Sequence, residues 1–105
     1  MIQIILTSHG PMAEAMISSA AMLYGEKDNV TALSLGEDDN IEEFHARMER
    51  LLHTNTGGEG SLILCDIPGG TPCNTAVRLA EEYSSIAVLA GMNMVMLLEA
   101  LLCDE

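Results

Sequence analysis

The chain has 105 residues, a length typical of a single domain whose core lies on both sides of one sheet. Sixteen acidic against four basic residues give a formal net charge of −12, which argues against binding nucleic acid or an anionic membrane surface and suits a basic protein partner. The cysteines, Cys65, Cys73 and Cys103, are odd in number and lack a C-x-x-C spacing, which argues against a disulfide framework and a zinc site.

The chain shows no targeting or membrane segment. Its N-terminus is not basic and is not followed by a cleavage-like pattern, so no signal peptide is predicted. The most apolar tract, residues 86–98, is interrupted by Gly91 and Asn93 and is shorter than the roughly 20 residues that a membrane helix needs. We therefore expect a cytoplasmic protein without direct membrane insertion.

Four short apolar runs alternate with four helical patterns along the chain. Strands are predicted over residues 2–7, 30–35, 61–65 and 86–90, and helices over 11–24, 40–52, 72–83 and 92–102. The apolar runs show little alternation with polar residues, as is typical of parallel strands that are covered on both faces. The order predicts an α/β fold, doubly wound, with a mainly parallel sheet of about four strands in the order 2-1-3-4 and helices on both faces.

Capping signals predict where the helices begin. Pro11 is expected at the first helical position of the first helix, because its missing N–H would have no partner there. Asp39 and Glu42 are spaced as a capping box for the second helix. Thr71 is expected to be the N-cap of the third helix.

Two titratable residues follow neighbouring strands of this predicted sheet. His9 comes after the first strand and Asp66 after the third, and open α/β sheets bind ligands at this switch point, beyond the carboxyl ends of the strands. An imidazole backed by a carboxylate can act as a phosphoryl acceptor. Asp66 would hold Nδ1–H of His9 and leave Nε2 as the nucleophile.

The residues around this pair suit an anion. Gly10 precedes the first helix and Gly70 precedes the third, and glycines at helix starts let an anion approach free backbone N–H groups. Gly10, Gly70 and Thr71 are therefore the candidate phosphate-binding residues. The Thr71 hydroxyl either only shapes the turn as a cap or also contacts the phosphate. No metal site is predicted.

Three stretches, ILTSHG, LCDIPGGTPCNTA and VLAGMNMVMLLEAL, resemble the mannose-family enzyme IIA domain of the bacterial sugar phosphotransferase system (PTS). The resemblance covers essentially the whole chain, and the Gly-Gly-Thr-Pro-x-Asn turn is its most specific part. It implies that His9 accepts a phosphoryl group from the phosphocarrier HPr and passes it to a histidine of the IIB component, with Asp66 as the orienting carboxylate. No cofactor is implied, because a phosphohistidine donor already carries a reactive P–N bond.

Residues 1–105 are interpreted as a single IIA domain of this type that lacks the last helix and strand of the family. In the family, that strand can be exchanged between the subunits of a dimer. The predicted helix 92–102 is apolar on nearly every face, so we expect a homo-oligomer or marginal stability.

Two alternative functions are left open. A regulatory phosphoacceptor domain of the same fold would use the same acceptor chemistry without serving transport. A receiver-like signalling domain phosphorylated on Asp66 fits less well, because no acidic pair follows the first strand to hold Mg²⁺ and the single lysine, Lys27, lies before the second strand.

Overall fold

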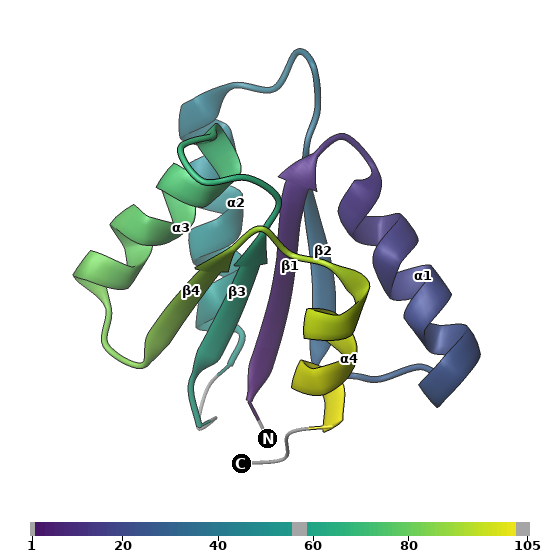
Figure 1. The fold of residues 1–105 in the computed structure, drawn as a ribbon. Helices are drawn as coiled ribbons and strands as arrows, with labels where there is room; N and C mark the ends of the chain where they lie inside the picture. Colours follow the sequence, from purple (N-terminus) through teal and green to yellow (C-terminus); the bar gives the residue numbers. More distant parts are fainter. Residues whose placement is uncertain (1, 56–58, 103–105) are drawn as a thin grey trace.

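The computed structural model of the protein describes residues 2–55 and 59–102, in which strands and helices alternate (Figure 1). The strands are β1 (Gln3–His9), β2 (Val30–Leu35), β3 (Ser61–Cys65) and β4 (Ile86–Ala90). The helices are α1 (Met12–Tyr24), α2 (Ile41–His53), α3 (Thr71–Glu82) and α4 (Met94–Leu102). Cys103 lies outside the described residues. Three of the four predicted strands have the predicted bounds.

The strands form one parallel sheet in the order β2-β1-β3-β4, which confirms the predicted fold class and strand order. Thr7 of β1 is in register with Cys65, the last residue of β3. Because all the strands run in the same direction, the ends of β1 and β3 meet at one edge of the sheet. This register brings His9 and Asp66 to the same place.

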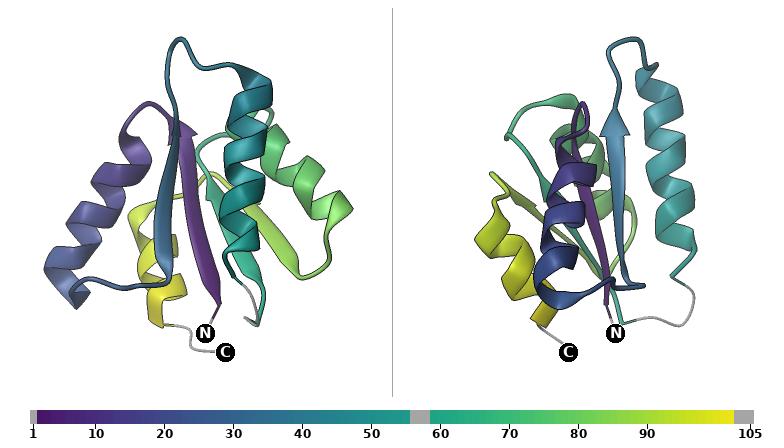
Figure 2. Two further views of the ribbon diagram at one scale, coloured as in Figure 1. Left: turned by 180° about the vertical axis from the view of Figure 1, so that it is seen from behind. Right: turned by 90° about the vertical axis from the view of Figure 1, so that its right-hand side faces the viewer.

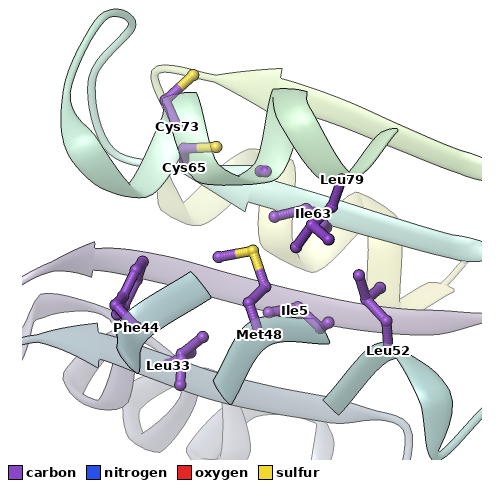
Figure 3. Close-up of a cluster of buried hydrophobic side chains, with 10 residues drawn as sticks. Ile5, Leu33, Phe44, Met48, Leu52, Ile63, Cys65, Cys73 and Leu79 are labelled. Carbon is purple, nitrogen blue, oxygen red and sulfur yellow. The ribbon is translucent and has the colours of Figure 1, made fainter. Parts of the chain in front are cut away.

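The sheet is covered by helices on both faces, and each face has its own apolar core (Figure 2). On one face, Ile5 and Ile63 pack with Phe44 and Met48 of α2 and with Leu79 of α3 (Figure 3). On the other face, the core contains residues of β1, β3, α1 and α4: Ile4, Leu6, Leu64, Ala13, Ala20, Leu97 and Ala100. Successive residues of β1 thus point to opposite cores, as the period of a strand requires.

Strand β1 continues two residues beyond its predicted end and includes His9. Thr7 and Ser8 are polar and resemble the start of a turn in the sequence, yet both are fully buried. The Thr7 hydroxyl donates to the carbonyl oxygen of Leu33 at 2.8 Å, and the Ser8 hydroxyl donates to the carbonyl oxygen of Gly10 at 3.1 Å. Because these hydroxyls find backbone partners, the strand can bury them without leaving an unsatisfied polar group.

Three predicted helix starts were wrong by one residue. Pro11 is the N-cap of α1 and not its first helical residue, because its carbonyl accepts the first helical bond, from Ala15 N–H. The N-cap of α2 is Asn40, whose side chain accepts from Glu43 N–H, and not Asp39. The N-cap of α3 is Gly70, which makes Thr71 the first helical residue.

Helix α4 and the neighbouring strand β4 expose apolar side chains. β4 is an outermost strand of the sheet, with a neighbouring strand on one side only, and its Leu89 is 49% exposed. Val95 of α4 is 67% exposed. Edge strands with exposed apolar residues are templates for association with another chain. None of the described helices is long and apolar enough to cross a membrane.

We predict that the chain self-associates through the exposed apolar residues of β4 and α4. Light scattering across a range of concentrations should show a mass above that of the monomer. The double variant Leu89→Lys/Val95→Lys should shift the protein towards the monomer. The matched control is Val77→Lys on α3, which covers the opposite face and should leave the mass unchanged. A wild-type monomer at every concentration would contradict the prediction.

Candidate functional site

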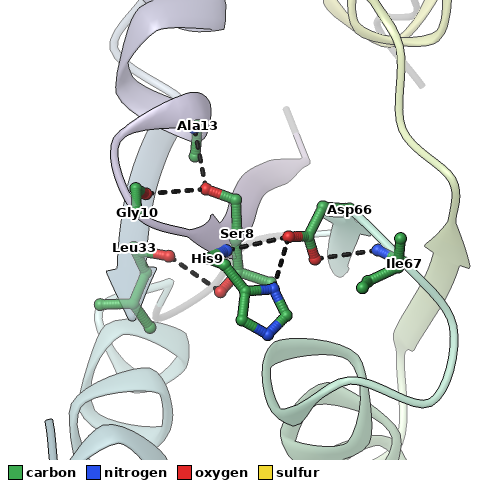
Figure 4. Close-up of polar contacts among 8 residues, drawn as sticks. Ser8, His9, Gly10, Ala13, Leu33, Asp66 and Ile67 are labelled. Atoms are coloured by element: carbon green, nitrogen blue, oxygen red, sulfur yellow. Dashed lines mark hydrogen bonds and ion pairs between the residues drawn. The ribbon is translucent and has the colours of Figure 1, made fainter. Parts of the chain in front are cut away.

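His9 and Asp66 form a direct contact at the carboxyl edge of the sheet (Figure 4). The His9 Nδ1 atom lies 2.8 Å from Asp66 Oδ2, and the backbone N–H of His9 donates to the same oxygen at 2.9 Å. The other carboxylate oxygen, Oδ1, accepts from Ile67 N–H at 2.9 Å. The carboxylate therefore holds both the backbone and the ring of His9.

The hydrogen bonds keep Asp66 ionised. Burial of the carboxyl group opposes ionisation, but the hydrogen bonds from the His9 backbone, the His9 ring and Ile67 outweigh burial and lower the pKa of Asp66. An ionised carboxylate is only an acceptor, so the ring nitrogen that faces it, Nδ1, carries the proton. In the neutral tautomer with the proton on Nδ1, the free lone pair is on Nε2. This arrangement matches the orientation of the ring expected from the sequence.

The two members of the pair differ in their access to solvent. The side chain of His9 is 47% exposed, whereas that of Asp66 is 11% exposed. The imidazole can therefore be reached by another molecule, while the group that orients it is covered.

Gly70 lies directly against the imidazole ring. A Cβ atom built at Gly70 would lie 2.9 Å from Cε1 and 3.5 Å from Nε2 of His9. The backbone of Gly70 is extended, with φ −82° and ψ 168°, which any residue can adopt. Glycine is thus needed here for space, because a side chain would displace the ring.

On the other side of His9, the turn into α1 is held by Ser8. The Ser8 hydroxyl oxygen accepts from Ala13 N–H in the first turn of α1 at 2.9 Å, so Ser8 supplies the side-chain cap that Pro11 cannot. Gly10 has a left-handed φ of 65°. Its N–H donates to the carbonyl oxygen of Leu35 at 2.9 Å. Gly10 therefore contributes the shape of the turn and open space beside His9, rather than a free backbone donor.

Thr71 stands next to Gly70 at the start of α3. No described residue forms a hydrogen bond with the Thr71 hydroxyl, and α3 has no side-chain cap. The interpretation of Thr71 as the cap is therefore wrong, because Asn74 N–H donates to Gly70 O, one residue earlier, at 2.8 Å. Its hydroxyl stays a candidate contact for an anion.

Two buried cysteines adjoin the site of His9 and Asp66. Cys65 ends β3 immediately before Asp66, and Cys73 is in the first turn of α3; both are buried and free. Burial, the neighbouring Cys73 and the charge of Asp66 raise the pKa of Cys65 to about 12. Cys65 is therefore a neutral thiol at physiological pH, which makes it a poor nucleophile. Within residues 2–55 and 59–102, no group of three His, Cys, Asp or Glu side chains is placed to hold a metal ion.

Ser8 and Asn74 are two polar residues of this site that sequence analysis did not assign. Asn74 donates from its side-chain amide to the carbonyl oxygen of Gly69 at 3.2 Å. Asn74 ends the Gly-Gly-Thr-Pro-x-Asn turn, so its position was visible in the sequence although its contact was not. The small hydroxyl side chain of Ser8, a few residues before a helix start, was the corresponding signal on the other side.

Comparisons with known proteins agree on one family. The profile of the family described as "PTS system fructose IIA component" matches residues 3–105. The mannose-specific EIIAB component of the PTS system from Escherichia coli (strain K12) is 35% identical over 108 residues, which covers 99% of this chain and 32% of that protein. The fructose-specific EIIA component of the PTS system from Bacillus subtilis (strain 168) is 32% identical over 105 residues, covering 100% of this chain and 72% of that protein.

Solved structures give the same result. The mannose/sorbose specific IIA subunit of the phosphotransferase system from Enterococcus faecalis superposes with a TM-score of 0.90 at 33% sequence identity. That superposition covers 99% of this chain and 78% of the solved one. The chain thus spans about a third of the length of the two-part EIIAB relative and about three quarters of the single IIA subunits.

We predict that Gly70→Ala displaces the His9 ring while the fold is retained. The added methyl group would lie too close to Cε1, so the half-exposed ring should swing outward and its bond to Asp66 should weaken. The ¹⁵N shifts of the imidazole, measured by NMR, report this bond directly. In the control variant Gly36→Ala, the new methyl group meets Asp39 and not His9, so the shifts should not change. Wild-type imidazole shifts in Gly70→Ala would contradict the prediction.

Proposed function

Since the chain belongs to the mannose-type enzyme IIA family of the bacterial sugar phosphotransferase system, we propose that it carries phosphoryl groups on His9. The donor is phospho-HPr, and the acceptor is a histidine of the IIB component that phosphorylates the incoming sugar. In this relay the chain acts as the IIA component, between HPr and IIB.

The single observation that carries the proposal is the asymmetry of the His9 ring. One ring nitrogen, Nδ1, is held by the covered carboxylate of Asp66, and the ring as a whole is 47% exposed. A nucleophile that must accept a group from one protein and give it to another needs a fixed orientation and open access on its reactive side. With Nδ1 held by Asp66 on a half-exposed side chain, Nε2 is the ring nitrogen that is left for this role.

The same contacts favour His9 over Asp66 as the phosphoryl acceptor. Both oxygens of Asp66 already accept hydrogen bonds, Oδ2 from His9 and Oδ1 from Ile67. Phosphorylation of either oxygen would break these bonds in a place that solvent and partners barely reach. The receiver-like alternative therefore has no support in the geometry.

The proposed transfer step requires neither a metal nor a nucleotide. The lone pair of Nε2 attacks phosphorus, the P–N bond to the HPr imidazole breaks, and that imidazole leaves with the electron pair. The proton on Nδ1 of His9 stays in place, so the phosphorylated ring is positively charged. The Asp66 carboxylate, 2.8 Å from Nδ1, stabilises that charge without receiving a proton. The reverse sequence delivers the phosphoryl group to IIB.

The start of α3 is the proposed cradle for the phosphoryl oxygens. Gly70 borders the Nε2 side of the ring, and the Thr71 hydroxyl beside it has no partner among the described residues. A helix N-terminus offers free N–H groups and a favourable dipole to an anion. Gly10 follows His9 in the chain, and apart from its chain neighbours no described atom lies within 4 Å of the position that a Cβ atom would occupy there, which leaves room for the group.

The surface at the His9 edge suits a basic partner with an apolar contact face. Met12, Ile41 and Ile67 are exposed at this edge, where the turns that follow the strands lie. Acidic side chains dominate the turn after β2 and the first turn of α2: Glu37, Asp38, Asp39, Glu42 and Glu43. Charge of one sign around an exposed apolar patch steers an oppositely charged protein and contributes to its affinity.

We predict that His9 is the labelled residue. Incubation with phosphoenolpyruvate, enzyme I and HPr should add one acid-labile phosphoryl group, and His9→Ala should abolish labelling. His53→Ala is the matched control, because His53 lies at the far end of α2, against Tyr83, and should leave labelling intact. Labelling at Asp66, or unchanged labelling of His9→Ala, would refute the proposed function.

The transport role has its own readout in the same assay. Phosphorylated protein mixed with a IIB component should lose its label to IIB. Efficient labelling from HPr without transfer to any IIB component encoded beside the gene would instead favour the regulatory alternative.

We predict that Asp66→Asn slows the reaction without moving the label. The amide keeps the shape of the side chain but weakens the hydrogen bond to Nδ1 and can favour the wrong tautomer. The single-turnover rate from phospho-HPr should fall roughly tenfold to a thousandfold, in line with the loss of a positioning partner. Mapping should still place the phosphate on His9. A wild-type rate would mean that Asp66 serves only the backbone of the turn.

A further inference from the structure

We propose that Asn74 is a positioning residue of the phosphoryl site. Its side-chain amide fixes the plane of the peptide between Gly69 and Gly70, and this directs the N–H of Gly70 towards the phosphoryl group on His9. The inference rests on the proposed function, because it assigns a role within the same site.

The turn that borders the imidazole is intrinsically loose. It contains two consecutive glycines, and Gly69 has a left-handed φ of 84°. Glycine has more backbone freedom to lose on folding than any other residue, so a Gly-Gly pair holds one geometry only when other groups hold it there. A Cβ atom built at Gly70 would lie 2.9 Å from Cε1 of His9, so the geometry of this turn affects the ring.

Asn74 holds this turn through two separate bonds. Its backbone N–H donates to the carbonyl oxygen of Gly70 at 2.8 Å, which is the first bond of α3. Its side-chain Nδ2 donates to the carbonyl oxygen of Gly69 at 3.2 Å. The first bond would form with any residue other than proline at position 74. The second depends on the asparagine side chain.

The bond to Gly69 determines where the next N–H points. The peptide bonds of the described residues are all trans, and in a trans peptide the C=O of one residue and the N–H of the next point in opposite directions. When Asn74 holds the Gly69 carbonyl, the N–H of Gly70 is therefore turned away from Asn74. No described group accepts a hydrogen bond from this N–H, which leaves it available to a phosphoryl oxygen.

If the peptide between Gly69 and Gly70 flipped, it would repel the phosphoryl group and no longer stabilise it. Without Asn74, the Gly69–Gly70 plane is free to rotate, and rotation would present a carbonyl oxygen where the N–H stood. A carbonyl dipole would repel the phosphoryl oxygens, whereas an N–H stabilises the charge that they carry in the transition state. The amide of Asn74 thus acts through Gly70 and does not need to touch the transferred group.

The chain contains a matched control for the asparagine contact. Asn55 Nδ2 donates to the carbonyl oxygen of Gly60 at 2.9 Å, so an asparagine amide again holds the carbonyl of a glycine five residues away. Gly60 precedes β3, so this contact lies at the opposite edge of the sheet from His9. Asn74→Ala and Asn55→Ala remove the same kind of bond, but only Asn74→Ala affects the turn at His9.

The test uses phosphoramidate as the donor, because this small molecule transfers a phosphoryl group to histidine with loss of ammonia and needs no docking surface. Asn74→Ala should lower the single-turnover rate roughly tenfold to a hundredfold, while Asn55→Ala should phosphorylate at the wild-type rate. The amide proton of Gly70, followed by NMR, should shift on phosphorylation in wild type and in Asn55→Ala. The shift should be absent or much smaller in Asn74→Ala.

The outcomes separate this inference from the function on which it rests. If wild type is not labelled on His9, the proposed function fails, whatever the variants do. If wild type is labelled and Asn74→Ala keeps the wild-type rate and the Gly70 shift, the role of Asn74 is refuted while the function stands. A variant that is slowed only with phospho-HPr, and not with phosphoramidate, would also refute it, because Asn74 would then act in docking.

Discussion

The site depends on the two hydrogen bonds that Asp66 accepts from His9, one from the backbone and one from the ring. A single carboxylate oxygen accepts from both the backbone N–H and the ring Nδ1 of the same residue. The first bond joins the last residue of β1 to the turn after β3, and the second fixes the ring relative to that backbone. The orientation of the imidazole is therefore determined by the parallel register of two strands and not by a flexible loop.

Short polar side chains hold the turns at this edge of the sheet. Ser8 caps α1, Asp39 accepts from Gly36 N–H, Asn74 holds Gly69, and Asn93 accepts from Met96 N–H at the start of α4. Each contact runs from a side chain to a nearby backbone group, so each turn is stabilised within its own crossover. All of these contacts join a polar side chain to a backbone group, and even where the backbone group belongs to a core residue, as at Ala13, no apolar side chain takes part.

The fold was predictable because its determinants are local and repeated. Continuous apolar runs such as residues 61–65, each followed by a helical pattern, leave little freedom once parallel crossovers are required. The proximity of His9 and Asp66 followed from the strand order alone, since residues after neighbouring parallel strands meet at one edge. The assignment of roles to these residues remains a proposal that the labelling experiments address.

The boundaries of β1 and α3 were misplaced because they depend on hydrogen bonds that the sequence does not show. Thr7 and Ser8 are polar and fully buried, and only the backbone groups that they reach in space, such as Leu33 O, show why the strand continues through them. Thr71 was mistaken for the cap because threonine suits that position, yet the first helical bond begins at Gly70. The contact between Gly70 and the imidazole joins residues from two different crossovers, so no local pattern could reveal it.

If His9 carries the proposed phosphoryl group, the half exposure of its side chain implies a compromise between protecting that group and passing it on. A fully enclosed phosphohistidine would be protected from hydrolysis, but it could not be reached by two different proteins in turn. An imidazole that is 47% exposed would leave the proposed phosphoryl group open to water as well as to partners. Such a group would have a limited lifetime, so the proposed carrier would suit a rapid relay of phosphoryl groups and would not store them.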